Sequence, residues 1–319
     1  MELFKQPNVD WLGKKWFFLG FSLIFSVAGV LSILFWHHLP LGVDFKGGTH
    51  ITVRFDSSPN EDHIRAAMDK AGIHDARIQS MSGGGTAGYQ EVIALPESTA
   101  TDANHDAGRM AVENALKSNY QDGPFSVQQV DIVGPTAGKQ LQKQALWATL
   151  YSLLGMLAYL WFRFELIYGV AAVVAVFHDT LITIGAFSLT NQEITLTVIA
   201  AILTLIGYSM NDTVVVFDRI RENLAMSRRE ELSVVVNRSI NQTLSRTVLS
   251  SGLTFLTVMS LFLFGGEVLH GFSFALVVGI LIGTYSSIAV AAPMLVAWQD
   301  YRAAQGKASA TLPAGRARA

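Results

Sequence analysis

The chain has 319 residues and a formal net charge of -2, and half of its residues are hydrophobic whereas 15% are charged. Because no global basic field is present, nucleic acid is not an expected partner. The sequence contains no cysteine, which excludes disulfides and cysteine-ligated metals. The apolar residues are clustered, and apolar runs of about 18 residues or more with few charges are typical of transmembrane helices.

Six such runs follow one another, so we expect an α-helical polytopic membrane protein. The first run follows Lys14 and Lys15, is about 20 residues long and has no clear small-x-small cleavage site after it, so it is interpreted as an uncleaved anchor. The sixth run is long enough to tilt, or to kink at Pro293. The expected spans are 16–36, 145–162, 166–189, 194–217, 246–264 and 271–298.

Positive charge in the short connections predicts the orientation, because it marks the cytoplasmic side of a membrane. Lysines and arginines gather before the first span, between the second and third, between the fourth and fifth, and after the sixth. Both termini are therefore expected in the cytoplasm. The cytoplasmic parts would be 1–15, a loop at 218–245 and a tail at 299–319, with 37–144 outside.

Two of these parts carry further expectations. Glu230 to Ile240 is amphipathic and is expected to lie along the membrane surface. The tail from Gly306 onward is rich in Ala, Gly and Arg and is expected to be disordered.

The outside segment, residues 37–144, is expected to form a small α+β domain. Its order of strand, helix, strand, strand, helix, strand is that of the ferredoxin-like (βαββαβ) fold. We see no cluster of His, Asp and Glu at metal spacing, and expect no metal site, cofactor or catalytic residue. The expected strands are 49–55, 76–81, 90–95 and 126–133, the helices are 61–72 and 104–118, and a flexible turn lies at 82–85.

The strand that begins this domain follows a glycine-punctuated segment, in which Gly47 and Gly48 are free to adopt positive φ. No helix N-terminus follows to complete an anion site, so a structural motif is favoured over a phosphate cradle. The motif comprises Asp44, Phe45, Lys46, Gly47 and Gly48.

Asp212 lies inside the fourth span, where an ionisable group costs about 2.5–3.5 kcal/mol on insertion scales and is a functional-site hypothesis by default. Tyr208 and Ser209 share its helix face and could hydrogen-bond it. Asn211 is a further supporting polar residue. The alternative is an interfacial acid near a helix end.

The third span carries His178 and Asp179 near its midpoint. Neighbouring hydroxyls such as those of Thr180 and Thr183 could simply satisfy this pair. The alternative is a proton-handling role, because histidines and carboxylates inside membranes recur in proton relays.

The fifth span opens with Arg246, at the depth where Asp212 is expected, so the two residues could form an ion pair across antiparallel helices. An arginine that snorkels at a helix end is the alternative. Arg246 would lie in a polar stripe with Thr243, Ser250, Thr254 and Thr257, among which Ser250 is a supporting polar candidate. Gly279 and Gly283 in the sixth span have the GxxxG spacing of close helix packing.

Five stretches together resemble one family, SecF, the smaller of two paired membrane subunits of the bacterial protein-export machinery. The resemblance covers almost the whole chain. It rests on GVDFKGGT, FHDTLITIGAFSL, IGYSMNDTVVVFDRIREN, NQTLSRTVLSSG and FLFGGEVLHGFSFALVVGILIGTYSSI, in this order.

The resemblance implies a subunit that pairs with SecD in a unit of the resistance-nodulation-division (RND) superfamily. That unit assists the SecYEG channel and uses the proton-motive force, or sodium in some relatives, to pull a preprotein outward after SecA has acted. The family places a proton-linked acid at the position matching Asp212 and a coupled arginine at that matching Arg246. YajC and a YidC-like insertase are further implied partners, besides membrane lipid.

Three other functions stay open. An RND-type exporter of small molecules or lipids usually carries two such membrane halves on one chain. A passive translocon scaffold would need no buried acid. An intramembrane hydrolase is the weakest alternative, because His178-Asp179 lacks an evident nucleophile and no HExxH or GxSxG motif occurs.

Overall fold

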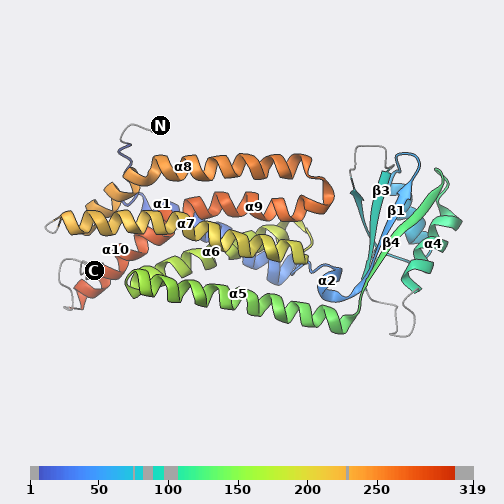
Figure 1. Cartoon of the computed structure of the whole chain (residues 1–319), viewed down its shortest axis with the longest axis horizontal. Helices are drawn as coiled ribbons and strands as arrows, with labels where there is room; N and C mark the ends of the chain where they lie inside the picture. The colour runs from blue at the N-terminus through green and yellow to red at the C-terminus, as the bar shows by residue number, and fades with distance from the viewer. Residues whose placement is uncertain (1–6, 75, 82–88, 97–106, 228–229, 306–319) are drawn as a thin grey trace.

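A computed structural model describes residues 7–74, 76–81, 89–96, 107–227 and 230–305 of the chain. Figure 1 shows two parts, an elongated helix bundle and a small sheet domain beyond one end of it. We call this end of the bundle the domain end, and the opposite end the far end. The predicted turn at 82–85, the start of the helix expected at 104–118 and the tail from Gly306 onward lie outside the described residues.

Six segments of the described chain are long and apolar enough to cross a membrane, as predicted. The first and last of them each contain one π-helical turn, Ser32–Trp36 after α1 and Ser287–Ala291 between α9 and α10. The second π-helical turn ends just before Pro293, where the proline ring disturbs regular helical bonding. The helices are α1 Lys15–Leu31, α5 Pro135–Arg163, α6 Leu166–Thr190, α7 Leu196–Met226, α8 Leu232–Phe264, α9 Gly266–Ser286 and α10 Ala292–Ala304.

Two helices begin well before their apolar runs. α5 begins at Pro135, which suits the first helical position because its missing N–H would lack a partner there. α8 begins at Leu232 and continues unbroken into the span, so the prediction of a separate surface segment at Glu230 to Ile240 is wrong. Its apolar face packs inside the bundle, where Val235, Val236 and Ile240 are fully buried.

Helices α6, α7 and α9 form the centre of the bundle and are packed through small residues. A Cβ added to Gly185 of α6 would lie 2.7 Å from the Cα of Gly29 on α1. A Cβ on Gly279 would lie 2.4 Å from Leu205, and one on Gly283 would lie 3.0 Å from the Cβ of Ser209. The predicted close packing at the GxxxG sequence is therefore confirmed, and α7 is its partner.

The sheet domain has the predicted ferredoxin-like order. Its antiparallel sheet runs β2-β3-β1-β4, and helices α3 and α4 share one apolar core with it. Alternation along β1 buries Ile51, Val53 and Phe55 against both helices. The elements are β1 Gly48–Phe55, α3 Glu61–Lys70, β2 Arg77–Met81, β3 Tyr89–Pro96, α4 Ala107–Asn119 and β4 Phe125–Val133.

The glycine motif forms the connection from the bundle to β1. Val43–Lys46 folds as one helical turn, α2, and Gly47 and Gly48 follow with φ of 82° and 143°. The predicted positive φ values are confirmed. Gly138 at the start of α5 allows the closest approach, since a Cβ there would lie 2.8 Å from the carbonyl oxygen of Phe45.

Candidate functional site in the helix bundle

Asp179 is the centre of one buried polar cluster, with 1% of its surface exposed. Its Oδ2 accepts hydrogen bonds from the hydroxyls of Ser209 on α7 at 2.6 Å and of Ser286 on α9 at 2.7 Å. The Nδ1 of His178 lies 3.0 Å from Oδ1. One carboxylate of α6 thereby joins three central helices.

Asp212 is the centre of a second cluster, with 3% of its surface exposed. Its Oδ2 accepts a hydrogen bond of 2.6 Å from the hydroxyl of Ser251 on α8. Asp212 therefore joins α7 to α8, and its side chain is buried inside the bundle.

The expected support from Ser209 is wrong, because this hydroxyl donates to Asp179. Side chains on a helix lean towards its N-terminus, so Ser209 points away from the turn that carries Asp212. Tyr208 is half-buried, and its Oη makes no hydrogen bond to a described residue. Asn211 lies exposed on the surface of α7.

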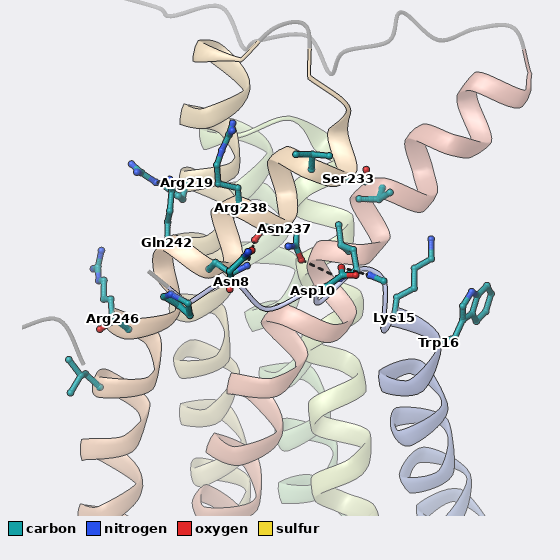
Figure 2. A pocket seen from close by; sticks show the side chains of 18 residues that line it. Asn8, Asp10, Lys15, Trp16, Arg219, Ser233, Asn237, Arg238, Gln242 and Arg246 are labelled. Carbon is teal, nitrogen blue, oxygen red and sulfur yellow. Dashed lines mark hydrogen bonds between the residues drawn. The ribbon is translucent and has the colours of Figure 1, made fainter. Parts of the chain in front are cut away.

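The expected Asp212–Arg246 ion pair is not formed between these two described residues. Ser251 of α8 lies at the depth of Asp212, since the two side chains are hydrogen-bonded. Arg246 precedes Ser251 by five residues on the same continuous helix, and so lies about 7.5 Å from it along the axis at 1.5 Å per residue. Figure 2 shows the Arg246 side chain extending towards the far end of the bundle. It lines a hollow of about 1520 Å³ there, which Lys15, Arg219 and Arg238 also line.

The polar stripe expected on α8 lies partly outside the bundle, since Arg246, Ser250 and Thr257 are exposed, Thr254 is half-buried and Thr243 is buried. A second stripe at four-residue spacing shares Thr243 with it and is buried against the bundle. This second stripe contains Ser239, Thr243, Thr247 and Ser251. That spacing was visible in the sequence and was the available signal for Ser251, which sequence reasoning missed.

An asparagine clamp at the far end was not anticipated. Asn237 and Asn241, one turn apart on α8, bind the backbone of the segment that precedes α1. Their side-chain oxygens accept from the N–H groups of Trp11 at 2.8 Å and Val9 at 3.0 Å, and both side-chain amides donate to the carbonyl of Val9. The clamp fixes the segment that leads into α1 against the part of α8 that precedes Arg246, and Figure 2 shows this segment beside Asn237.

The glycine motif contributes one polar contact to the bundle. The Oδ2 of Asp44 accepts a hydrogen bond of 2.9 Å from the backbone N–H of Leu196, the first residue of α7. The other motif residues shape the connection, with Phe45 buried and Lys46 exposed. The motif therefore attaches the sheet domain to the helix that carries Asp212.

The arrangement can respond to a proton more readily than it can catalyse a covalent reaction. Two carboxylates are buried among membrane-length helices, and each bonds hydroxyls from neighbouring helices. In the described part of the chain no group of three or more His, Asp or Glu residues could hold a metal ion. Gain or loss of a proton at either carboxylate would change how the helices attract one another.

Comparison with known proteins identifies the class first. The family model for the C-terminal region of the protein export membrane proteins SecD and SecF matches residues 111–301, and the model for the SecD/SecF GG motif matches residues 37–59. The chain is 51% identical to the protein translocase subunit SecF of Koribacter versatilis, covering 99% of this chain and 98% of that one. It is 40% identical to that of Calditerrivibrio nitroreducens, covering 92% and 96%.

The chain therefore belongs to the SecF family of protein translocase subunits, and it is a transport component rather than a classical enzyme. A crystal structure of SecDF from Thermus, described as a translocon-associated membrane protein, matches with a TM-score of 0.79 and 35% identity over 92% of this chain. SecDF in a super-membrane-facing form matches with a TM-score of 0.71 and 35% identity over 96%. The chain spans 39% and 40% of those longer SecDF chains.

Proposed function

We propose that this chain works with SecD as the ion-coupled part of a protein translocase, in which Asp212 takes up and releases the coupled proton. The proton-motive force would then drive late steps of export, after SecA-driven translocation. The burial of Asp212 inside a membrane-length apolar helix carries the proposal, because such an acid is costly to retain without a function.

The contact between α7 and α8 is the element that a proton would change. A hydroxyl donates a stronger hydrogen bond to a carboxylate than to a neutral carboxyl group, so protonation of Asp212 weakens its bond from Ser251. Two packings of α7 against α8 can then exchange dominance, with Arg246 approaching Asp212 in one of them. Each proton that crosses supplies about 2.3 kcal/mol per 100 mV, enough to shift such populations substantially.

His178 and Asp179 belong to the same proposal as a connected group. Ser209 precedes Asp212 by three residues on α7 and donates to Asp179 on α6. A shift of α7 would therefore strain or release the Asp179 cluster, whether or not that cluster itself binds the coupled proton.

The proposed orientation puts the far end in the cytoplasm and the sheet domain outside the inner membrane. Its support is the basic far end, where Lys15, Arg219, Arg238 and Arg246 surround the hollow of Figure 2. The sheet domain, at the opposite end in Figure 1, would meet the emerging preprotein.

SecD is proposed to cover the exposed polar faces of α7 and α8. Polar side chains on a membrane-spanning helix are unfavourable when they face lipid, whereas small and polar residues are typical of helix–helix contacts in membranes. A partner of SecD type also agrees with the matching SecDF chains, of which this chain spans about two fifths. The exposed residues are Thr197, Thr204, Gly207 and Asn211 on α7 and Arg246, Ser250 and Thr257 on α8.

Export of a secreted precursor into inverted membrane vesicles tests the proposal. Wild type and Asp212→Asn are compared with and without a proton-motive force, after ATP is exhausted. We expect the wild type to complete translocation only with the gradient and Asp212→Asn to fail in both conditions, because asparagine cannot exchange the proton.

Asp218→Asn offers a matched control, since it makes the same change at an exposed position of the same helix, in a surface ion pair with Arg163. Asp218→Asn should leave the gradient response unchanged in the same assay. Equal activity of wild type and Asp212→Asn, with both proteins present in the membrane, would favour the passive scaffold instead.

A further inference from the structure

The sheet domain and the helix bundle meet at the turn between α6 and α7. The backbone N–H of Gly42 donates to the carbonyl of Ile194 at 2.9 Å, and the N–H of Ile194 donates to the carbonyl of Pro40 at 2.8 Å. Two residues after Ile194, the backbone N–H of Leu196 donates to the Oδ2 of Asp44. The connection to the sheet domain is therefore bonded to the start of α7 through both backbone and side chain.

One ion pair joins the sheet itself to this turn. The Nε of Arg77 on β2 lies 2.9 Å from Oε1 of Glu193, whose side chain is 11% exposed. The two residues are far apart in the sequence and belong to the two different parts of the molecule. A pair with one partner this sheltered is screened less by solvent than a surface pair.

The ion pair lies at the start of a rigid connection to the buried acid. Leu196 and Asp212 belong to one continuous helix, α7, and are separated by about 24 Å along its axis at 1.5 Å per residue. A displacement of α7 in the bundle therefore moves the turn on which Glu193 lies.

We propose that Arg77 and Glu193 are positioning residues that hold the sheet domain over the start of α7, so that a shift of α7 is transmitted to the domain. This inference rests on the proposed ion-coupled function. It adds a mechanical contact for that function, in a part of the molecule remote from both buried carboxylates.

The contact is sensitive to acid on the side of the sheet domain. Burial raises the pKa of Glu193, whereas Arg77 on β2, His50 on β1 and Lys46 on α2 lower it and Asp44 raises it, with burial the largest influence. From α9, His270 lies 3.4 Å from the neighbouring Gln192.

The sign follows from the raised pKa. The folded state binds a proton at Glu193 more tightly than the unfolded chain does. Lowering the pH from above the raised pKa to the ordinary pKa of a glutamate therefore increases the stability of the fold. The same change in pH neutralises the carboxylate. The ion pair is present above the raised pKa and lost below it, without loss of the fold.

Pulsed electron paramagnetic resonance can test the contact directly, because the chain has no cysteine of its own. Spin labels at Asp62→Cys on α3 and Ser260→Cys on α8 report the distance between sheet domain and bundle, and both positions are exposed. The full chain is measured together with SecD in vesicles. Arg77→Glu, Glu193→Arg and the double exchange are compared with Arg65→Glu, an equal charge change at an exposed position of α3.

We expect a narrow distance distribution in the wild type, a broad one in each single charge reversal, and a narrow one again in the double exchange and in Arg65→Glu. Acidification outside should broaden the wild-type distribution, whereas Glu193→Gln should be broad at every pH. Narrow distributions in both single reversals would overturn the contact as a positioning device.

Export measured on the same variants separates this inference from the proposed function. Both single reversals should slow gradient-driven export several-fold, and the double exchange should recover it. Broader distance distributions in the single reversals together with unchanged export would overturn the role of the Arg77–Glu193 pair in transmitting the shift of α7, even if Asp212→Asn abolishes export. An active Asp212→Asn protein would instead overturn the proposed function, whatever the distances show.

Discussion

Asp179 and Asp212 are both buried carboxylates of the same bundle, and they differ in how their neighbours bond them. Asp179 accepts two serine hydroxyls and faces a histidine nitrogen, whereas Asp212 has Ser251 as its hydrogen-bond partner among the described residues. The Asp179 carboxylate is held by donors from two other helices, α7 and α9, although the Nε2 of His178 is buried without a hydrogen-bond partner among the described residues. Asp212 is held from one other helix, α8. The comparison therefore favours Asp179 as a structural joint and Asp212 as the group whose protonation changes helix packing.

The largest expected effect is on folding, from removal of the Asp179 carboxylate. Asp179→Leu leaves the hydroxyl of Ser209 and the Nδ1 of His178 without their partner, at about 1–3 kcal/mol for each group left unsatisfied. Ser286 also loses its shorter bond and keeps the one to the carbonyl of Gly283. Asp212→Leu removes the partner of Ser251 alone. Thermal unfolding of the purified proteins in detergent should give a clearly lower Tm for Asp179→Leu than for Asp212→Leu. The reverse order would contradict the structural assignment of Asp179.

The next effect is on activity and separates two serines of α8. Ser251→Ala removes the donor to Asp212, and a hydrogen bond to a charged group is worth about 1.5–3 kcal/mol, so gradient-driven export should slow by about tenfold or more. Ser260→Ala removes an exposed hydroxyl from the same helix and should export at nearly the wild-type rate. Equal rates for the two variants in the vesicle assay would remove Ser251 from the coupling machinery.

A smaller effect is expected from crowding the Asp179 cluster without removing any of its polar atoms. Gly283→Ala places a methyl group 3.0 Å from the Cβ of Ser209, and overpacking of this kind costs about 1–3 kcal/mol. Gly155→Ala on α5 is the matched control, since a Cβ there meets nothing within 4 Å. The Tm should fall for Gly283→Ala and stay level or rise slightly for Gly155→Ala. A Tm for Gly283→Ala equal to that of Gly155→Ala would show that Ser209 moves aside freely.

The fold could be predicted well because its signals are local. Long apolar runs indicate spans, and the alternation in β1, which buries Ile51, Val53 and Phe55, indicates a sheet with one covered face. The positive φ of Gly47 and Gly48 could also be predicted from residue type alone. Each of these features depends on neighbours in the sequence.

The contacts of the candidate site could be predicted only in part, because they depend on where helices begin and how they are rotated. Asp179 and Asp212 were found as buried acids, but the partner of Asp212 depends on α8 starting at Leu232. Hydropathy could not show this, since the first turns of α8 are amphipathic and resemble a surface helix. The Arg77–Glu193 pair joins two separately folded parts and left no pattern in the sequence.

The smallest predicted effect compares two helix caps, one within the sheet domain and one across the joint to the bundle. The side chain of Asn60 accepts from the N–H of Asp62 in α3, whereas that of Asp44 accepts from Leu196 in α7. Replacing either residue by alanine removes a cap worth about 1 kcal/mol. Hydrogen exchange followed by mass spectrometry should show faster exchange confined to the first turn of α3 in Asn60→Ala.

In Asp44→Ala the faster exchange should extend from the first turn of α7 to the α6–α7 turn, because the lost bond also joined the two parts of the molecule. The size of the effect would be similar at the two caps, and its spread would differ. Exchange confined to the first turn of α7 would mean that the backbone ladder at Ile194 and the Arg77–Glu193 pair hold the joint without the aspartate. The spread of exchange thus measures how far the attachment of the sheet domain depends on the glycine motif.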